Sequence, residues 1–180
     1  MNYDFNIEGS LFSNFESLFE QHELPAKTTL LREGEIANKI YLVKKGCLRQ
    51  WFNKDGKDIT FQFFFENQTV SSFDSFINNI PSIFSIESIE PSDVYSLSKN
   101  HFNNILREQP HFKDKLLELA FQRFRHYTQL FLSRIKDSPR ERYEELRKNH
   151  PEILQRVPQH YIASYLGITS VSLSRIRNRK

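Results

Sequence analysis

The spacing of apolar residues changes along the chain, and each change predicts a different kind of element. From Leu11 to Phe19 they recur three or four residues apart, which predicts a short amphipathic helix. Short β-rich runs separated by turn residues follow from Leu24 to Leu97. Helical spacing returns after Ser98 and continues into the C-terminal part of the chain.

Six short runs rich in β-branched and aromatic residues occupy the middle of the chain. No long helical segment separates them, so they predict an antiparallel sandwich or roll rather than a parallel sheet. Asp55-Gly56 favours a tight hairpin because both residues tolerate positive φ. The predicted strands are residues 28–32, 39–43, 47–52, 59–65, 83–89 and 94–97.

A stretch without glycine or proline runs from Phe112 to Ile135 and predicts one helix of about 35 Å. It carries too many apolar residues for a single stripe, so one face can dock on the β-domain while another needs a partner. A copy of the same helix across a twofold axis is the simplest partner. The alternative is that both faces are covered within one chain. The expected dimer contacts are Leu117, Phe121, Phe124 and Phe131.

The segment from Ser138 to Glu141 reads SPRE, a capping box with proline at the first helical position. It predicts a sharp helix start, so Asp137-Ser138 is the expected hinge before a C-terminal domain. The predicted division is residues 1–110, an N-terminal helix with a β-roll sensor domain; 111–136, the long dimerisation helix; and 137–180, a C-terminal helical domain.

The last stretch, QHYIASYLGITSVSLSRIRNRK, has the spacing of a helix-turn-helix. Ala163 stands where two crossing helices need a small residue, and Gly167 where the tight turn needs positive φ. Leu173 and Ile176 supply the buried stripe of the second helix. An ordinary C-terminal helical hairpin is the alternative interpretation.

The second helix of this motif, with Thr169 as its expected N-cap, would present one free face to the DNA major groove. Arg175 is the expected base-reading residue, because arginine pairs with a guanine edge through two hydrogen bonds. Serines near the helix N-terminus can bond phosphate oxygens, and Val171 can meet a thymine methyl. The predicted DNA-binding residues are Gln159, Thr169, Ser170, Val171, Ser172, Arg175 and Arg179.

Charge supports a polyanionic partner at this end of the chain. The formal net charge is only +3, yet residues 153–180 contain no Asp or Glu. Such a local excess of positive charge attracts nucleic acid through counterion release. The basic residues of this segment are Arg156, Arg175, Arg177, Arg179 and Lys180.

Composition also narrows the class of protein. The single cysteine, Cys47, excludes a disulfide framework and any cluster held by several thiolates of one chain. Apolar runs are too short to span a bilayer and the N-terminus has no signal pattern, so we expect a cytoplasmic protein without a membrane partner.

Catalytic and metal-binding patterns are missing from the sequence. No histidine lies between Leu24 and Asn100, so the predicted strands lack the ligands of a metal-dependent β-roll enzyme. Asp55, Asp58 and Glu66 fall at turns and strand ends, where we expect them to be solvated. There is no P-loop, nucleophile elbow or G-x-G-x-x-G. We expect no metal, no cofactor and no enzymatic activity.

In its order of elements the chain resembles the Crp/Fnr superfamily of bacterial transcription regulators. The resemblance lies in LPAKTTLLREGEIANKIYLVKKGCLRQWF, where Gly34 and Gly46 fall at strand turns, and in YLGITSVSLSRIR, which is similar to the recognition helix of the divergent Bacteroidetes branch. It implies an α+β fold: a jelly-roll-like, cyclic-nucleotide-binding-type β-roll, a dimerisation helix and a helix-turn-helix domain of the winged class, here without the wing. It also implies a homodimer on palindromic double-stranded DNA, with RNA polymerase as a candidate partner and an unknown effector.

The nucleotide site of that family is where this sequence departs from it. Members that bind cyclic nucleotides present a Gly-Glu pair and, further on, an Arg followed by a small hydroxyl residue. Here serines stand at these positions, and no Lys or Arg lies between Lys57 and Lys99. Because a buried phosphate needs a cation or strong hydrogen bonds, we expect no cyclic-nucleotide response. The degenerate pocket would be lined by Ser71, Ser72, Phe73, Ser82 and Phe84.

Three alternatives stay open at this stage. Arg123 or Arg125 of the long helix can supply the missing charge only by turning over the roll, and we expect both to remain solvated. The aromatic residues beside the serines are expected to fill the roll, but they also suit a neutral or apolar ligand. If the helix-turn-helix contacts protein instead of DNA, the chain is a sensory or adaptor module for a small molecule or protein partner.

Overall fold

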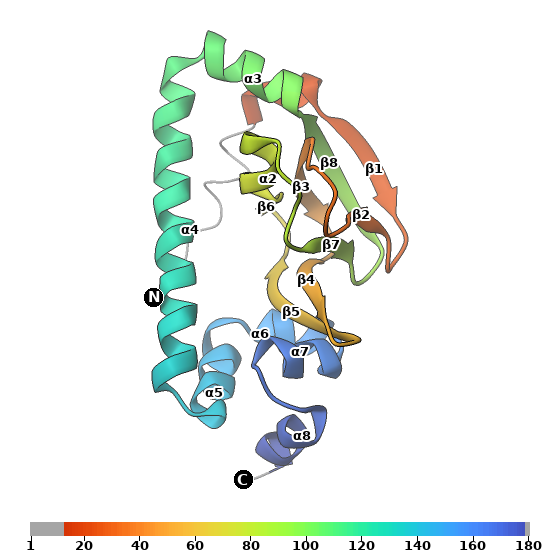
Figure 1. Cartoon of the computed structure of the whole chain (residues 1–180), viewed down its shortest axis with the longest axis vertical. Coiled ribbons are helices and arrows are strands. Elements are labelled where there is room, and N and C mark those ends of the chain that lie inside the picture. The colour runs from red at the N-terminus through yellow and green to blue at the C-terminus, as the bar shows by residue number, and fades with distance from the viewer. Residues whose placement is uncertain (1–12, 179–180) are drawn as a thin grey trace.

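The computed structural model describes residues 13–178 and contains a β-roll, a long helix and a group of C-terminal helices (Figure 1). It opens with η1, a 3₁₀ helix at Ser13–Leu18. The strands are β1 Glu20–Leu24, β2 Thr29–Leu31, β3 Lys39–Lys45, β4 Leu48–Lys54, β5 Lys57–Phe64, β6 Thr69–Val70, β7 Ser85–Ser88 and β8 Ser92–Ser98. The helices are α2 Phe73–Asn78, α3 Lys99–Glu108, α4 Pro110–Lys136, α5 Pro139–Asn149, α6 Pro151–Arg156, α7 Gln159–Tyr165 and α8 Ser170–Asn178.

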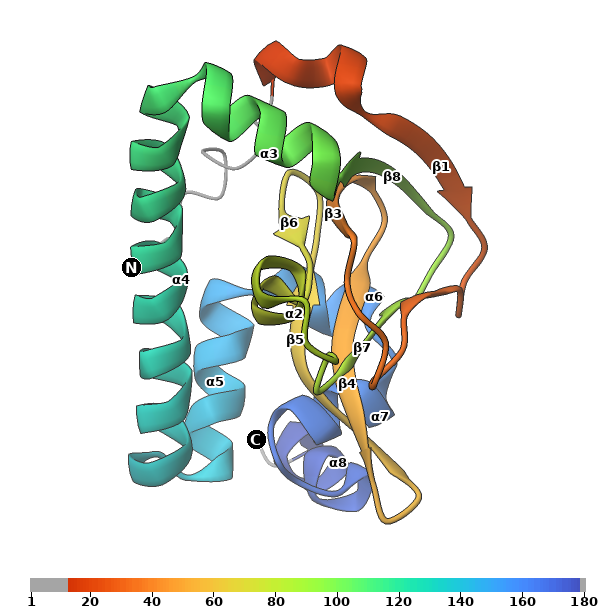
Figure 2. The same ribbon diagram turned by 45° about the horizontal axis from the view of Figure 1, so that its top comes forward.

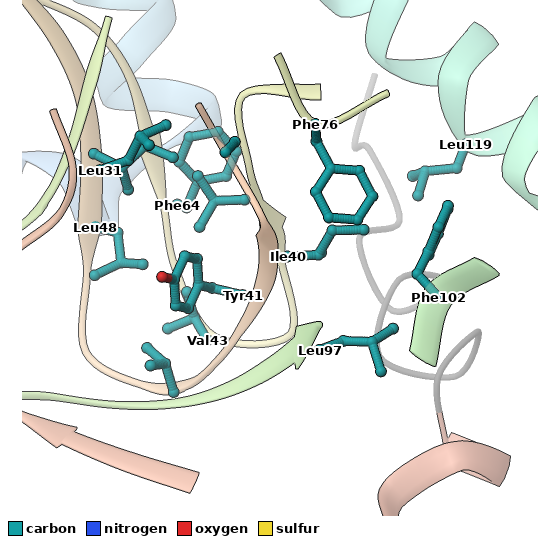
Figure 3. Packing of buried hydrophobic residues seen from close by; sticks show 14 of the residues in the cluster. Leu31, Ile40, Tyr41, Val43, Leu48, Phe64, Phe76, Leu97, Phe102 and Leu119 are labelled. Carbon is teal, nitrogen blue, oxygen red and sulfur yellow. The ribbon is translucent and has the colours of Figure 1, made fainter. Parts of the chain in front are cut away.

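The strands form two antiparallel sheets with the orders β1-β8-β3-β6 and β2-β7-β4-β5. Apolar side chains from both sheets fill the space between them, among them Ile40, Leu48 and Leu97, each 1% exposed or less. Phe102 of α3 and Leu119 of α4 close one end of this core (Figure 3). The predicted α+β fold with an antiparallel roll and a long helix is confirmed.

Two turns between strands contain glycine where the sequence predicted a turn. Asp55 and Gly56 both have positive φ, and the β4–β5 register pairs Lys54 with Lys57 across a two-residue turn. Gly46 has a φ of +103°, and a Cβ atom there would lie 2.2 Å from the Ser92 hydroxyl oxygen. Only glycine therefore fits the junction between β3 and β4.

Some elements differ from the sequence prediction. Strand β1 was not predicted because it is mostly polar and lies at a sheet edge, where alternation of buried residues is weak. Helix α2 lies in a serine-rich segment and was not predicted. The N-terminal helix is a 3₁₀ helix over Ser13–Leu18, so Phe19 lies beyond its end, and Leu11 lies outside the described residues.

Helix α4 begins at Pro110 and has two apolar sides, as its composition predicted. One side packs on the β-roll through Phe112 and Leu119, which are buried. The other side faces solvent in the single chain. Its residues are Leu117, Phe121, Phe124 and Phe131, which are 57%, 60%, 70% and 64% exposed.

Helix α7 packs against β5 of the β2-β7-β4-β5 sheet (Figures 1 and 2), while α6 and α8 contact α7 and α5 contacts α6. Phe63 and Phe65 join a buried cluster with residues of α5 to α8, including Ile162 and Leu173. Pro151 is the first residue of α6, a helix that was not predicted. None of the helices in the described region has the length and apolarity that crossing a bilayer requires.

Candidate nucleic-acid interface

Helices α7 and α8 form the predicted helix-turn-helix. Ala163 is 2% exposed at the helix crossing, and Gly167 in the turn has a φ of +68°. The backbone N–H of Ile168 donates to the carbonyl of Ala163 at 2.9 Å and closes the turn. Ala163 and Gly167 therefore lie where the motif requires a small buried residue and a positive φ.

The N-terminus of α8 is capped as predicted. The Thr169 hydroxyl oxygen accepts a hydrogen bond from the backbone N–H of Ser172 at 3.1 Å and lies 3.0 Å from the Ser172 hydroxyl. Leu173 is 1% exposed, and Ile176 packs beside the same cluster. The buried stripe of α8 therefore has the composition that the sequence predicted.

The opposite side of α8 faces solvent. Val171 is 61% exposed, and Ser170 and Arg175 are exposed beside it. Helical geometry places Ser174 and Asn178 on this side as well, and both are exposed although the sequence prediction omitted them. We call these five residues of α8 the exposed face: Ser170, Val171, Ser174, Arg175 and Asn178.

The other predicted DNA-binding residues lie at different places. Gln159 is exposed at the first position of α7, and Thr169 is exposed at the N-cap of α8. Ser172 is half-buried and its hydroxyl is bonded to Thr169. Arg179 lies outside the described residues.

The helix-turn-helix is bound to the β-roll by a polar contact between α7 and β5. The Ser164 hydroxyl accepts from the backbone N–H of Thr60 at 2.8 Å and donates to the carbonyl of Asp58 at 3.2 Å. Tyr161, one helical turn earlier, lies with its ring 3.9 Å from the guanidinium carbon of Arg49 in β4. These contacts fix the position of α7 relative to strands β4 and β5.

Arg49 is a buried charge at this contact, with 1% of its surface exposed. Its guanidinium donates to Asp58 at 3.0 Å, to Glu87 at 3.1 Å and to the Thr60 hydroxyl at 3.1 Å. A buried guanidinium is tolerated only with such partners. Asp58, expected to be solvated, therefore binds an arginine, and no local sequence pattern indicated this cluster.

A second arginine, Arg156 of α6, binds two carboxylates of the roll. It donates to both carboxylate oxygens of Glu66, at 2.9 and 2.8 Å, and to Glu90 at 3.1 Å. These hydrogen bonds hold the pKa of Glu66 at about 2. Glu66, expected to be solvated, keeps 36% of its side chain exposed but is also ion-paired. Arg156, counted in the basic end of the chain, therefore has its positive charge balanced by carboxylates of the roll.

The serines of the degenerate pocket are bonded to the chain itself. The Ser71 hydroxyl donates to the carbonyl of Lys39 at 2.9 Å, and the Ser82 hydroxyl to the carbonyl of Phe84 at 2.7 Å. Ser72 is buried at the N-cap of α2. The half-buried rings of Phe73 and Phe84 pack against the main core. Most of the residues predicted to line this pocket are therefore hydrogen-bonded to the backbone or packed against the core.

Arg123 corrects one sequence expectation, because it does not remain solvated. It is half-buried, and its guanidinium donates to the carbonyl of Thr69 and to the Thr69 hydroxyl, the latter at 3.1 Å. The same group lies 5.4 Å from the ring centre of Phe64 and 5.8 Å from that of Phe73. Arg125 is exposed, as expected.

A small cavity lies where the roll, α4 and the C-terminal helices meet. Its lining includes His126 of α4, His150 and Glu152 near the start of α6, and Tyr165 of α7. Burial lowers the pKa of His126 to about 4, and the neighbouring charges of His150 and Arg123 add to this effect. His150 lies 3.3 Å from the Glu152 carboxylate. Among the described residues, no group of three or more His, Cys, Asp and Glu side chains could hold a metal ion.

Comparison with known proteins relates the β-roll to a described domain. Residues 21–109 match the family model of the cyclic nucleotide-binding domain. The anaerobic regulatory protein of Bacillus subtilis (strain 168) is 26% identical over 95 residues, which are 52% of this chain and 40% of that protein. The matched stretch therefore spans less than half the length of that relative.

Three solved structures share the arrangement of the whole chain. A CooA mutant from Carboxydothermus hydrogenoformans has a TM-score of 0.74 at 18% identity, covering 99% of this chain and 85% of that one. FixK2 from Bradyrhizobium japonicum has a TM-score of 0.75 at 17% identity, covering 88% and 82%. The catabolite activator protein of Thermus thermophilus has a TM-score of 0.59 at 18% identity, covering 93% and 84%. The chain therefore has the fold of Crp/Fnr-type regulators.

The buried histidine predicts how stability depends on pH. Between pH 6.5 and about 4 the unfolded chain binds a proton at His126 that the folded chain does not bind, so stability falls as the pH falls. The loss is at most about 3 kcal/mol. Denaturant unfolding between pH 6.5 and 5.5 stays above the ordinary pKa of 4.5 at which Glu66 titrates in the unfolded chain, so the loss in this window reports mainly on His126.

His126→Gln should flatten this pH dependence, while the same change at the exposed His111 should leave it unaltered. Equal slopes for wild type and His126→Gln would contradict the assignment.

Proposed function

We propose that this chain is a sequence-specific, DNA-binding transcription regulator of the Crp/Fnr type, from the divergent branch typical of Bacteroidetes. It acts in the cytoplasm as a homodimer on a palindromic site, by binding and not by catalysis. The observation that carries this proposal is the exposed face of α8, which presents Val171 and Arg175 to solvent while Leu173 anchors the helix.

The charge distribution supports DNA as the partner. Helices α7 and α8 contain no acidic residue, and α8 carries Arg175 and Arg177, both exposed. An arginine on the free side of a helix suits a guanine edge, and small hydroxyl residues suit phosphate oxygens. RNA polymerase is a candidate partner once the regulator is bound.

The exposed side of α4 supports the homodimer. Leu117, Phe121, Phe124 and Phe131 lie along one side of the helix, opposite the residues that pack on the roll. Ile135 continues this row and is 68% exposed. Exposed apolar surface of this extent marks an interface, and a second α4 matches it in length and composition.

Removing Arg175 should weaken specific binding. A duplex selected from random sequence with the wild-type chain should bind in a salt-sensitive way, with half-sites about 10 bp or a multiple apart. Arg175→Ala should lose about 1–3 kcal/mol and relax selectivity at one base pair. Arg177→Ala, one helical turn after the buried Leu173 and therefore farther from Val171 and Arg175, should weaken binding more uniformly across sequences. Gel-shift titrations measure both, and absence of salt-sensitive duplex binding would remove the proposal.

A charge on the exposed side of α4 should dissociate the dimer. Sedimentation of the wild type should give twice the chain mass of 21.5 kDa. Phe124→Glu should give a monomer, because a carboxylate would be buried between two apolar helices without a partner. Lys115→Glu, an exposed position away from this row, should remain dimeric. A wild-type monomer that binds a palindrome tightly would contradict the dimer.

Cyclic AMP and cyclic GMP should not bind below about 10 µM, roughly −7 kcal/mol. The reason is that Ser71 and Ser82 bond to the backbone and Arg123 is already held by Thr69. Calorimetric titration measures this directly. If either nucleotide binds, loss of binding in Arg123→Ala but not in Arg125→Ala would show that Arg123 supplies the missing charge.

A further inference from the structure

Two arginine side chains connect the end of α4 and the hinge after it to the turn of the helix-turn-helix through hydrogen bonds. Arg142 of α5 donates to the carbonyl of Asp137 at 2.6 Å and to the carbonyl of Leu166 at 3.0 Å. Arg134, in the last turn of α4, donates to the carbonyl of Tyr165 at 2.7 Å. One carbonyl belongs to the hinge, and the other two belong to the turn between α7 and α8.

The two turn carbonyls are those that the end of a helix leaves without partners. The last carbonyls of a helix cannot be bonded within it. Backbone N–H groups of the turn bond to the carbonyls of Ile162, Ala163 and Ser164. Tyr165 and Leu166 come next, and each receives a guanidinium, which the negative end of the helix dipole also favours.

These contacts reach the point from which the recognition helix departs. Gly167 follows Leu166 directly, and a Cβ atom there would lie 3.8 Å from a guanidinium nitrogen of Arg134. The Tyr165 ring packs against Phe63 of β5 with ring centres 5.3 Å apart. Both views show α5 between the end of α4 and helices α7 and α8 (Figures 1 and 2).

We propose that Arg134 and Arg142 are positioning residues that fix the direction of α8 relative to α4, and so set the half-site spacing that a dimer accepts. This rests on the proposed function. Because α4 carries the dimer contact, a tie from α4 to the turn fixes each α8 relative to the twofold axis. The distance between two such helices determines which half-site spacing both can engage.

Binding to palindromes of different spacing, compared with a single half-site, tests this proposal. A palindrome binds more tightly than a half-site because the second contact is intramolecular, with an effective concentration set by geometry. Arg134→Ala and Arg142→Ala should keep half-site affinity within about twofold of wild type. They should lose about tenfold on the preferred palindrome and less at spacings one or two base pairs longer or shorter, which flattens the spacing profile.

The controls separate positioning from loss of charge. Lys136→Ala removes a positive charge from the same end of α4, where no tie to the turn is involved, and should leave the spacing profile unchanged. The slope of log affinity against log salt should also be unchanged in Arg134→Ala and Arg142→Ala, since a lost phosphate contact would reduce it. Arg142→Lys keeps the charge but cannot bridge two carbonyls, so it should resemble Arg142→Ala.

Several results would overturn the proposal: an unaltered spacing profile, an equal loss on half-site and palindrome, or a reduced salt slope. If Arg142→Ala fails to fold, Arg142→Lys carries the test. If Arg134→Ala fails to fold, Arg134→Met carries it, because methionine keeps an unbranched side chain but cannot donate to the Tyr165 carbonyl.

If the wild type binds no duplex, the proposed function is wrong, and spin labels decide the positioning claim separately. With labels at Arg125→Cys in α4 and Ser174→Cys in α8, and labelled chains diluted in unlabelled ones, the distance distribution should be narrow in wild type and broad in the Arg134 and Arg142 variants. Distance distributions of equal width in the wild type and the variants would contradict the positioning role of Arg134 and Arg142.

Discussion

The neutralisation of Arg49 is the constraint on which the arrangement of this molecule depends. Its guanidinium is buried where β4 meets α7, and it is stable there only because Asp58, Glu87 and Thr60 accept hydrogen bonds from it. The Tyr161 ring of α7 and the Trp51 ring of β4 also lie against it, with ring centres 3.9 and 4.6 Å from the guanidinium carbon. Withdrawing α7 would uncover the cluster, so the charge of the roll and the position of the helix-turn-helix are linked.

Docking on the sheet leaves the helix-turn-helix one free side. Helix α7 contacts β5 through Ser164, and Arg156 joins the preceding helix to Glu66 and Glu90. The turn is held from the α4 side by Arg134. The exposed face of α8 remains accessible, so the contacts that orient the domain do not compete with the surface proposed to meet DNA.

The roll has the architecture of a cyclic nucleotide-binding domain but different chemistry at the expected ligand position. Serine hydroxyls are bonded to nearby carbonyls, as at Ser71 and Ser82. Arg123 reaches from α4 to Thr69 and connects the long helix to the roll. The chain itself therefore makes a polar bridge between the long helix and the roll.

The sequence by itself determined what neighbouring residues decide: the hairpin at Asp55-Gly56, the two-sided α4, the capped start at Ser138 and the turn at Gly167. Each is a matter of backbone conformation or of helical spacing, so a short window contains the necessary information. Only the tertiary structure decided the partners of Glu66 and Arg123, which lie 90 and 54 residues away in the sequence. Whether an arginine beside a carboxylate stabilises the fold depends on how deeply the pair is buried and on the distance between the two groups. Both are properties of the packed chain.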